Sequence, residues 1–406
     1  MTTFLVSDGI EYTYKDLLDK VNSSENYCPI FKTNNLFDFF VNIIVALSSN
    51  KDIWLLDSDI NDFELGEMDF HKINSLEQTV KPFYVSIDQL NNSILNSKSK
   101  LYLFTSGTTG QPKKISHYIE NLLRSVKIYL DITPKVWAFA YNPSHMAGIQ
   151  VFFQTLLNKN TIVNVFNLNR DKVLKLINEF NVTNISATPT FYRLLLPYER
   201  SYESVKMITF GGEKSDDNLY NKILTIFPNA QIRNIYASTE AGALLSTKND
   251  AFFIPKDKSN LIKIVDNELL IHKLLIGESV SLKLVDDYYH SGDLVEWVEE
   301  SNKELFRFKA RKNESINIGG YKVNPSEIES ILCEIEGVQN SIVYGKSNSV
   351  LGYILCAEVI VADKEKVSEL IIKNHLKEKL QNYKIPRIIK FVDNFSMTRT
   401  GKIKRI

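Results

Sequence analysis

The 406-residue sequence predicts an α/β protein with a large N-terminal region and a smaller α+β C-terminal unit. Apolar, strand-like runs alternate with segments of helical periodicity over the first three-quarters of the chain, which is typical of a substantially parallel sheet. After His290 the pattern changes to charged, hairpin-like strands. The length also exceeds what one hydrophobic core usually serves, so two or more domains are expected.

The alternation is clearest between residues 136 and 227. Apolar and β-branched runs predict strands at residues 136–141, 161–166, 183–187 and 205–210. Helical spacing predicts helices over residues 145–157, 170–180 and 216–227, and a short one from Thr190. The strands end in NPSHMAG, GGE and YASTE, and the earlier run LYLF ends in TSGTTG. Parallel sheets place ligand loops at the carboxyl ends of their strands, so a nucleotide site is expected there.

The C-terminal part is expected to fold as a separate unit. SGDLVEW and ELFRFKAR are predicted to pair as strands around the turn-like ESNK, and helices are predicted near residues 325–335 and 364–380. Residues 312–314 are the best candidate linker. The predicted domains are therefore residues 1–311 and residues 312–406.

Composition excludes several classes of protein. The 48 basic and 48 acidic residues cancel, which gives no global reason to expect nucleic acid or an anionic membrane as partner. Three separated cysteines suit a reducing compartment, and no CxxC or HxxxH pair suggests a zinc site. No signal-like N-terminus or membrane-length apolar run is present. We therefore expect a soluble, cytoplasmic protein without a membrane span.

The segment LYLFTSGTTGQPKK, residues 101–114, is the most informative stretch. Backbone N–H groups of a Gly-rich turn can converge into an anion-binding nest, to which hydroxyls and lysines add donors and positive charge. A polyphosphate is the expected ligand. The alternative, for this loop taken alone, is a Gly-Thr surface turn that binds no ligand. The spacing differs from the GxxxxGK[ST] phosphate loop.

Five motifs occur in a fixed order: TSGTTGQPK, IYASTE (235–240), YHSGD (289–293), ARKNESINIGGYKVNPSEIE from Ala310, and TRTGKIKR (398–405). Together they resemble the adenylate-forming superfamily of acyl- and aryl-CoA synthetases, luciferases and adenylation domains of nonribosomal peptide synthetases. Weaker similarity extends to EYTYKDLL and residues 55–57. The resemblance implies a large ATP- and acid-binding domain with mixed sheets, an abbreviated first ~100 residues, and a small mobile lid.

The resemblance also implies an ATP site. Its phosphate loop would hold the β- and γ-phosphates through Thr105, Ser106, Gly107, Thr108, Thr109, Gly110 and Lys113. Glu240 would ligate Mg²⁺, a cation that takes carboxylate and phosphate oxygens. Thr239 would contact the α-phosphate, Tyr236 would stack on adenine, Asp293 would accept from the ribose hydroxyls, and Arg311 would contact ribose or phosphate. Gly212, Glu213, Ala237 and Ser238 complete the implied nucleotide-binding set.

The remaining implied roles concern the acid, the lid and the thiol. Lys402 on the lid would stabilise charge at the acid carboxylate and the α-phosphate. His145, Gly211 and Ala237 would border the acyl pocket, Gly319 and Gly320 would flank the pantetheine tunnel, and Asn313 would be the hinge. Taken alone, Tyr236 would more readily be a core tyrosine, His145 a structural histidine, and Ser291-Gly292-Asp293 a simple turn.

Several positions depart from the pattern of the superfamily. Ala237 replaces a common glycine beside the acid, which suggests a small or differently oriented substrate. Ala310 replaces a glycine, Asn317 replaces a frequent lysine, and Ser396 and Met397 replace a Pro-Lys pair. None of these changes removes a group that the chemistry requires.

The resemblance implies an AMP-forming acid–thiol ligase. A carboxylic acid and ATP would give an acyl-adenylate and pyrophosphate, and then the thiol of CoA, or the phosphopantetheine of a separate carrier protein, would displace AMP. INIGGYKVNPSEIE is particularly similar to o-succinylbenzoate–CoA ligases. A catalytically silent nucleotide- or partner-binding homologue, and transfer to an amine or hydroxyl, remain alternatives. The acid is not identified, and a monomer or a homodimer is expected.

Overall fold

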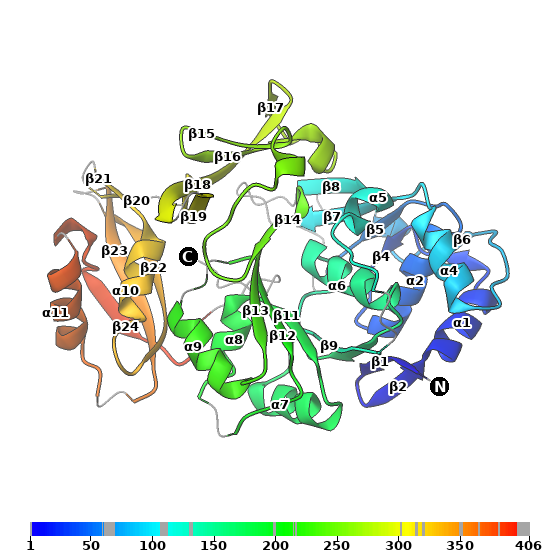
Figure 1. Cartoon of the computed structure of the whole chain (residues 1–406), viewed down its shortest axis with the longest axis horizontal. Helices are drawn as coiled ribbons and strands as arrows, with labels where there is room; N and C mark the ends of the chain where they lie inside the picture. Colours follow the sequence, from blue (N-terminus) through cyan, green and yellow to red (C-terminus); the bar gives the residue numbers. More distant parts are fainter. Residues whose placement is uncertain are drawn as a thin grey trace.

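The computed structural model of the chain shows an α/β protein with the N-terminal strands and helices at one end of its long axis and the C-terminal unit at the other (Figure 1). It describes residues 2–58, 60, 70–105, 113–129, 133–197, 200–213, 215, 217–300, 303–312, 316–318, 321–348, 352–363, 366–380 and 382–395. Within this part of the chain, no helix is long and apolar enough to cross a membrane.

The largest sheet has eight strands and confirms the predicted parallel architecture. Its order is β14 (Gly242–Thr247), β13 (Gln231–Ser238), β12 (Met207–Gly211), β11 (Asn184–Ala187), β9 (Val136–Phe139), β10 (Thr161–Asn164), β1 (Thr3–Ser7) and β2 (Ile10–Thr13). The strands from β13 to β1 pair in parallel, and the two edge strands pair antiparallel. The carboxyl ends of the inner strands therefore meet at one edge of the sheet.

The helices between these strands lie where the periodicity predicted them. They are α6 (Met146–Leu156), α7 (Arg170–Glu179), α8 (Pro189–Arg193) and α9 (Asp217–Ile226). Side-chain caps define where two of them begin: Asn169 accepts from the backbone N–H of Lys172, and Thr188 accepts from that of Phe191. Pro189 at the first position of α8 favours its start.

A four-stranded sheet forms the N-terminal part of the molecule. Its order is β4 (Ile30–Phe31), β5 (Ile53–Leu55), β7 (Lys100–Thr105) and β8 (Lys113–Tyr118). Around it lie α1 (Tyr14–Ser23), α2 (Leu36–Ser48), α4 (Ile87–Leu95), α5 (Ile119–Leu123), η1 (Phe70–Lys72) and the short pair β3 (Asn26–Tyr27) and β6 (Glu77–Gln78). All residues of α2 except Asp38 are buried, and Phe40 stacks on Phe152 of α6 at 4.2 Å, so α2 joins both sheets in one core.

A five-stranded antiparallel sheet follows. It comprises β15 (Ile262–Val265), β16 (Glu268–His272), β17 (Leu284–Val285), β18 (Tyr288–Glu300) and β19 (Lys303–Arg311), with η2 (Lys256–Lys258) and η3 (Lys273–Leu275) between strands. The predicted hairpin of β18 and β19 is confirmed, and its register places Asp293 opposite Arg311. This pairing brings two predicted site residues together.

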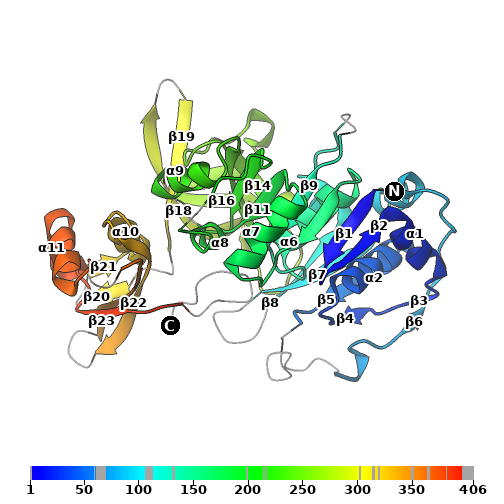
Figure 2. The ribbon, with the colours of Figure 1, turned by 90° about the horizontal axis from the view of Figure 1, so that it is seen from below.

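The C-terminal unit lies at the opposite end of the molecule from β1 and β2 in both views (Figure 2). It contains β20 (Ile316–Ile318), β21 (Tyr321–Val323), α10 (Pro325–Leu332), β22 (Val338–Asn348), β23 (Gly352–Val361), α11 (Glu369–Lys379), η4 (Asn382–Lys384) and β24 (Ile388–Phe391) around a core of its own. The start predicted for the second helix, residue 364, was too early. Ser368 is extended and caps α11 by accepting from the backbone N–H of Ile371, so the helix begins at Glu369.

Candidate active site

Four of the predicted site residues, Gly211, Gly212, Glu213 and Tyr236, lie at or near the ends of β12 and β13. These strands pair in parallel with Gly211 opposite Ile235. Gly211, Gly212 and Glu213 therefore leave the sheet beside Tyr236 and the residues that follow it. A Cβ added to Gly211 would lie 3.1 Å from the hydroxyl of the buried Tyr141, so the strand end approaches that side chain closely. This is the edge at which a doubly wound sheet binds its ligand.

Asp293 is the most highly organised carboxylate of this edge. The Tyr236 hydroxyl donates to its Oδ2 at 2.6 Å, and Nε of Arg311 donates to its Oδ1 at 2.7 Å. The ring of Tyr236 stacks on Phe308 at 4.3 Å between centroids. Burial, and then the charge of Asp293, raise the pKa of Tyr236 well above its ordinary value, so the phenol stays protonated as a donor. The structure thus brings Tyr236, Asp293 and Arg311 together from β13, β18 and β19.

A second carboxylate, Glu268, forms hydrogen bonds with residues adjacent to Asp293 and Arg311. Its buried side chain accepts from the backbone N–H of Gly292 at 2.9 Å, from Nδ1 of His290 at 3.2 Å and from Nζ of Lys312 at 3.3 Å. Burial acts to raise the pKa of Glu268, but these hydrogen bonds lower it on balance. Gly292 has φ +75°, a conformation that favours glycine immediately before Asp293.

Glu240 lies in the turn between β13 and β14 and differs from both. Its side chain is partly exposed, and within the described residues its carboxylate has no hydrogen bond or ion pair. Those residues also contain no group of three or more His, Cys, Asp or Glu side chains that could hold a metal ion. A single available carboxylate fits Mg²⁺, which is commonly held by one or two carboxylates together with substrate phosphates.

His145 lies at the start of α6 and is oriented by a buried acid. Its Nε2 is 3.1 Å from Oδ2 of Asp57, and Nδ2 of Asn142 donates to the same oxygen at 2.9 Å. Asp57 follows β5, so the acid comes from the four-stranded sheet and the histidine from the large one. The contact fixes the direction of the imidazole ring, as a paired carboxylate often does.

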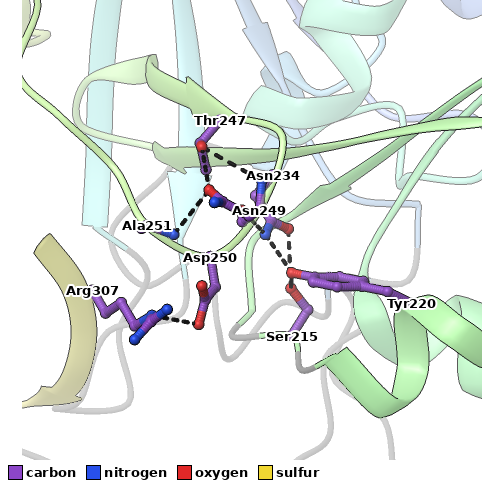
Figure 3. A network of polar contacts seen from close by, with 8 residues as sticks. All are labelled: Ser215, Tyr220, Asn234, Thr247, Asn249, Asp250, Ala251 and Arg307. Carbon is purple, nitrogen blue, oxygen red and sulfur yellow. Dashed lines mark hydrogen bonds and ion pairs between the residues drawn. The ribbon is translucent and has the colours of Figure 1, made fainter. Parts of the chain in front are cut away.

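A polar network joins Ser215 to Tyr220 of α9 and to Asn234 of β13 (Figure 3). The Ser215 hydroxyl lies 2.5 Å from that of Tyr220 on α9 and donates to Asn234 Oδ1 at 3.0 Å. Nδ2 of the buried Asn234 in turn donates to the Tyr220 hydroxyl and, at 2.5 Å, to the carbonyl of Asn249. Around these residues, Thr247 and the backbone N–H of Ala251 donate to Asn249 Oδ1, and Asp250 pairs with Arg307 at 2.7 Å.

Glu213 accepts hydrogen bonds from a neighbouring helix. Its Oε2 accepts from both the backbone N–H and the hydroxyl of Thr190, at 3.0 and 2.7 Å, in the first turn of α8. An acid near a helix N-terminus is electrostatically favourable. Glu213 therefore ties the end of β12 to α8, and its nucleotide contact stays a prediction.

Other predicted residues are only partly described. Ala237 and Ser238 end β13, and the Ser238 hydroxyl accepts from the backbone N–H of Ala241 at 3.2 Å. Lys113 opens β8 opposite Thr105, whose backbone alone is described. The other members of the predicted phosphate loop, the lid, the hinge and the tunnel lie outside the described residues: Ser106, Gly107, Thr108, Thr109, Gly110, Asn313, Gly319, Gly320 and Lys402.

Sequence reasoning missed Glu268 and did not assign a role to Asp57. Both are acids whose burial becomes evident only through partners distant in the chain, 22 residues away for Glu268 and His290 and 88 for Asp57 and His145. An acidic residue among apolar strand residues, as in NELLIH, was the available signal for Glu268.

Comparison with known proteins places this geometry in a family. The family described as AMP-binding enzyme matches residues 66–269, and that described as AMP-binding enzyme C-terminal domain matches residues 327–402. Among curated proteins, the chain is 26% identical over 342 residues to the uncharacterized acyl–CoA ligase YtcI of Bacillus subtilis, covering 75% of this chain and 64% of that protein. It is 26% identical over 360 residues to a 2-succinylbenzoate–CoA ligase of Listeria innocua, covering 82% and 74%.

Solved structures share the fold over 99% of the chain. The o-succinylbenzoate CoA synthetase (MenE) of Bacillus subtilis with its acyl-adenylate intermediate has a TM-score of 0.71 at 18% identity, covering 94% of that chain. ATP-bound MatB of Rhodopseudomonas palustris has a TM-score of 0.73 at 16% identity, also covering 94% of that chain. The present chain nevertheless spans less than two thirds of the length of YtcI.

Proposed function

Since the chain belongs to the AMP-binding enzyme family, we propose that it is an AMP-forming acid–thiol ligase. It would activate a carboxylic acid with MgATP and transfer the acyl group to a thiol. The observation that carries this proposal is the joining of Tyr236, Asp293 and Arg311 beside the Glu240 turn, at the carboxyl edge of the parallel sheet.

The nucleotide would lie across this edge. Asp293, whose two oxygens are already oriented by Tyr236 and Arg311, would accept from the ribose hydroxyls through its remaining lone pairs. The loop at residues 105–113 would bind the β- and γ-phosphates. Thr239 would contact the α-phosphate, and Glu240 with the phosphate oxygens would hold Mg²⁺.

In the first half-reaction, a carboxylate oxygen of the acid attacks the α-phosphorus. A new carboxyl O–P bond forms as the bond from the α-phosphorus to the bridging oxygen breaks, and pyrophosphate leaves with that electron pair. Two anions approach each other, so positive charge must lie where negative charge develops. Lys402 is the protein group that we assign to this task, and Mg²⁺ when bound supplies charge neutralisation at the phosphates.

The acid would enter between His145 and the end of β13. His145, held by Asp57, offers an oriented imidazole at the start of α6. The methyl group of Ala237, at a position where the resemblance leads us to expect glycine, would narrow such a pocket. We therefore propose a small or differently oriented carboxylic acid, bordered also by Gly211.

In the second half-reaction, the C-terminal unit would act as a lid. We propose that residues 312–406 rotate about Asn313 relative to residues 1–311, withdrawing Lys402 and presenting Gly319 and Gly320 to the thiol. The thiol sulfur attacks the acyl carbon, the carboxyl C–O bond to the adenylate breaks, and AMP leaves. CoA is the acceptor that the names of the relatives favour, and a separate carrier protein's phosphopantetheine is the alternative.

The experiment that tests this function is ATP–pyrophosphate exchange across a panel of small, aromatic and fatty acids. The proposal expects exchange that depends on one class of acid and on Mg²⁺, and no exchange with any acid would contradict it. Lys402→Ala should abolish exchange while largely sparing thioester formation from a supplied acyl-adenylate. Equal loss of both half-reactions would remove Lys402 from the adenylation step. Running the second step with CoA and with carrier proteins identifies the acceptor.

Three free cysteines are compatible with the cytoplasmic location proposed here. We propose that the protein acts as a monomer or a homodimer.

A further inference from the structure

The turn that contains Glu240 is fixed through its main-chain carbonyl groups by three neighbouring parts of the chain. The carbonyl oxygens of three consecutive residues each accept a hydrogen bond from a different element. Thr239 accepts from Nε2 of His117 at 2.8 Å, Glu240 from the backbone N–H of Gly277 at 2.7 Å, and Ala241 from Nη2 of Arg124 at 2.7 Å. We call residues 239–241 with these three donors the carbonyl clamp.

His117 is built into the protein as a neutral donor. It lies on β8 with only 2% of its surface exposed. A carbonyl oxygen can only accept, so Nε2 must carry the hydrogen. Burial lowers the pKa of His117 to about 4, which keeps the ring uncharged near neutral pH.

Gly277 completes the contact between His117 and the turn. A Cβ at this position would lie 2.6 Å from Cε1 of His117 and 2.6 Å from the carbonyl oxygen of Ser116, so a larger residue would displace one of them. The neighbouring residues Ser116 and Glu278 exchange two backbone hydrogen bonds, at 2.9 and 2.8 Å. The segment that donates to Glu240 is thereby bonded directly to β8.

Arg124 closes the clamp from the end of α5. Besides Ala241, its Nη2 donates to the carbonyl of Leu275 in η3 at 3.1 Å. The side chain is partly buried, and burial lowers the pKa of Arg124. A charged donor shared by two backbone carbonyls gives stronger hydrogen bonds than a neutral donor does.

We propose that His117 and Arg124 are positioning residues for the cation site. They fix residues 239–241 through main-chain carbonyls, so that the side chain of Glu240 stays available to Mg²⁺. His117 lies four residues after Lys113 on the strand that follows the phosphate loop. The clamp therefore links β8, the strand that begins at Lys113, to the turn whose acid is proposed to bind the cation.

This inference rests on the proposed function, because it assigns the clamp to MgATP. Neither positioning residue needs to touch the nucleotide. Supporting partners of metal ligands typically change metal affinity by roughly 10- to 100-fold when removed. An effect confined to Mg²⁺-dependent binding therefore distinguishes the clamp from general support of the fold.

The test compares two substitutions of His117 in the full chain. His117→Leu removes the donor, and His117→Gln retains an amide donor. For each protein we would measure the dissociation constant of AMP in EDTA and the Mg²⁺ concentration that half-saturates ATP binding, both by calorimetry. We expect His117→Leu to raise the half-saturating Mg²⁺ concentration about 10-fold, with AMP affinity within about 2-fold of wild type. His117→Gln should recover most of the loss.

Arg124→Met and Arg124→Lys repeat the comparison should His117→Leu not fold. Unchanged Mg²⁺ dependence in the folded variants, or equal loss of AMP and MgATP binding, overturns the inference and leaves the proposed function standing. A wild-type chain that binds neither AMP nor MgATP overturns both. Magnesium dependence that shifts in the Leu and Met variants and returns in the Gln and Lys variants supports the clamp.

Discussion

Asp293 and Glu240 are two carboxylates at the same edge of the sheet, and they are organised in opposite ways. Asp293 is buried, and each of its oxygens accepts from a side chain of the protein, Tyr236 or Arg311. Glu240 is partly exposed and makes no side-chain hydrogen bond or ion pair among the described residues, while its main chain is bonded to Gly277. One acid is oriented through its side chain, and the other through its backbone.

The difference follows from where each acid lies in the fold. Asp293 is part of β18, and its strand partner Arg311 is directly opposite on β19. Glu240 is in the short turn after β13, where the peptide groups, rather than the side chains, meet neighbouring elements. A carboxylate that the protein already orients, such as Asp293, is suited to accept hydrogen bonds from neutral ribose hydroxyls. A carboxylate without a protein partner, such as Glu240, is suited to bind Mg²⁺ together with the phosphate oxygens of the nucleotide.

The largest expected effect comes from Asp293→Ala. It removes the proposed ribose acceptor and leaves Arg311 without this ion pair, so AMP affinity measured in EDTA should fall on the order of 100-fold, or about 3 kcal/mol. Glu296→Ala is the matched control. Glu296 forms an exposed pair with Lys309 across the same two strands at 3.7 Å, and its loss should leave AMP affinity unchanged. If Asp293→Ala lowers the affinity for the carboxylic acid substrate more than the affinity for AMP, the ribose contact is contradicted.

Glu240→Gln is expected to have the next largest effect, of a different kind. It should raise the Mg²⁺ concentration needed for ATP binding on the order of 30-fold, about 2 kcal/mol, because a charged contact to the cation is lost. AMP affinity in EDTA should stay at the wild-type value. Titrations of MgATP and AMP by calorimetry measure both, and an unchanged Mg²⁺ requirement would exclude Glu240 from the cation site.

Tyr236→Phe sharpens the account of Asp293. The substitution keeps the ring that stacks on Phe308 and deletes only the hydroxyl that donates to Asp293 at 2.6 Å. AMP affinity should fall roughly 10-fold, the value of about one hydrogen bond to a charged group. The Mg²⁺ dependence should not move. If AMP affinity is retained in full, Arg311 alone is sufficient to orient the carboxylate.

The smallest expected effect is a pH dependence of the free energy of unfolding that comes from His117 in the carbonyl clamp. Burial lowers the pKa of His117 from 6.5 to about 4. Between pH 6.5 and pH 4, His117 is therefore protonated in the unfolded chain but neutral in the folded protein. Its contribution to stability is complete above pH 6.5 and is lost as the pH falls toward 4. Urea unfolding at about pH 7 and about pH 5.5 should show a decrease of about 1 kcal/mol from this group. The decrease should be absent from His117→Leu, and its persistence there would assign it to other groups.

The contrast also shows how far sequence could lead. Strands and helices could be predicted from local periodicity, whereas the role of Asp293 was implied only by the resemblance of the ordered motifs to the adenylate-forming superfamily. The supporting contacts could not be predicted, because they depend on tertiary pairing: His117 and Thr239 are 122 residues apart, and Asp57 and His145 are 88 apart. The start of α11 was misplaced because the cap at Ser368 outweighs the helical composition of the residues before it. The contact of Glu213 with Thr190 also depends on tertiary pairing, because Thr190 lies on α8 and Glu213 follows β12.

The most direct test of the account is a paired measurement on Asp293→Ala and Glu240→Gln. For each variant, the dissociation constant of AMP in EDTA and the Mg²⁺ dependence of ATP binding are determined on the same protein sample. The account predicts that Asp293→Ala weakens AMP binding and that Glu240→Gln leaves AMP binding intact while raising the Mg²⁺ requirement. If the two variants lose AMP affinity alike, or if neither changes the Mg²⁺ requirement, the two carboxylates do not divide the nucleotide between ribose and cation.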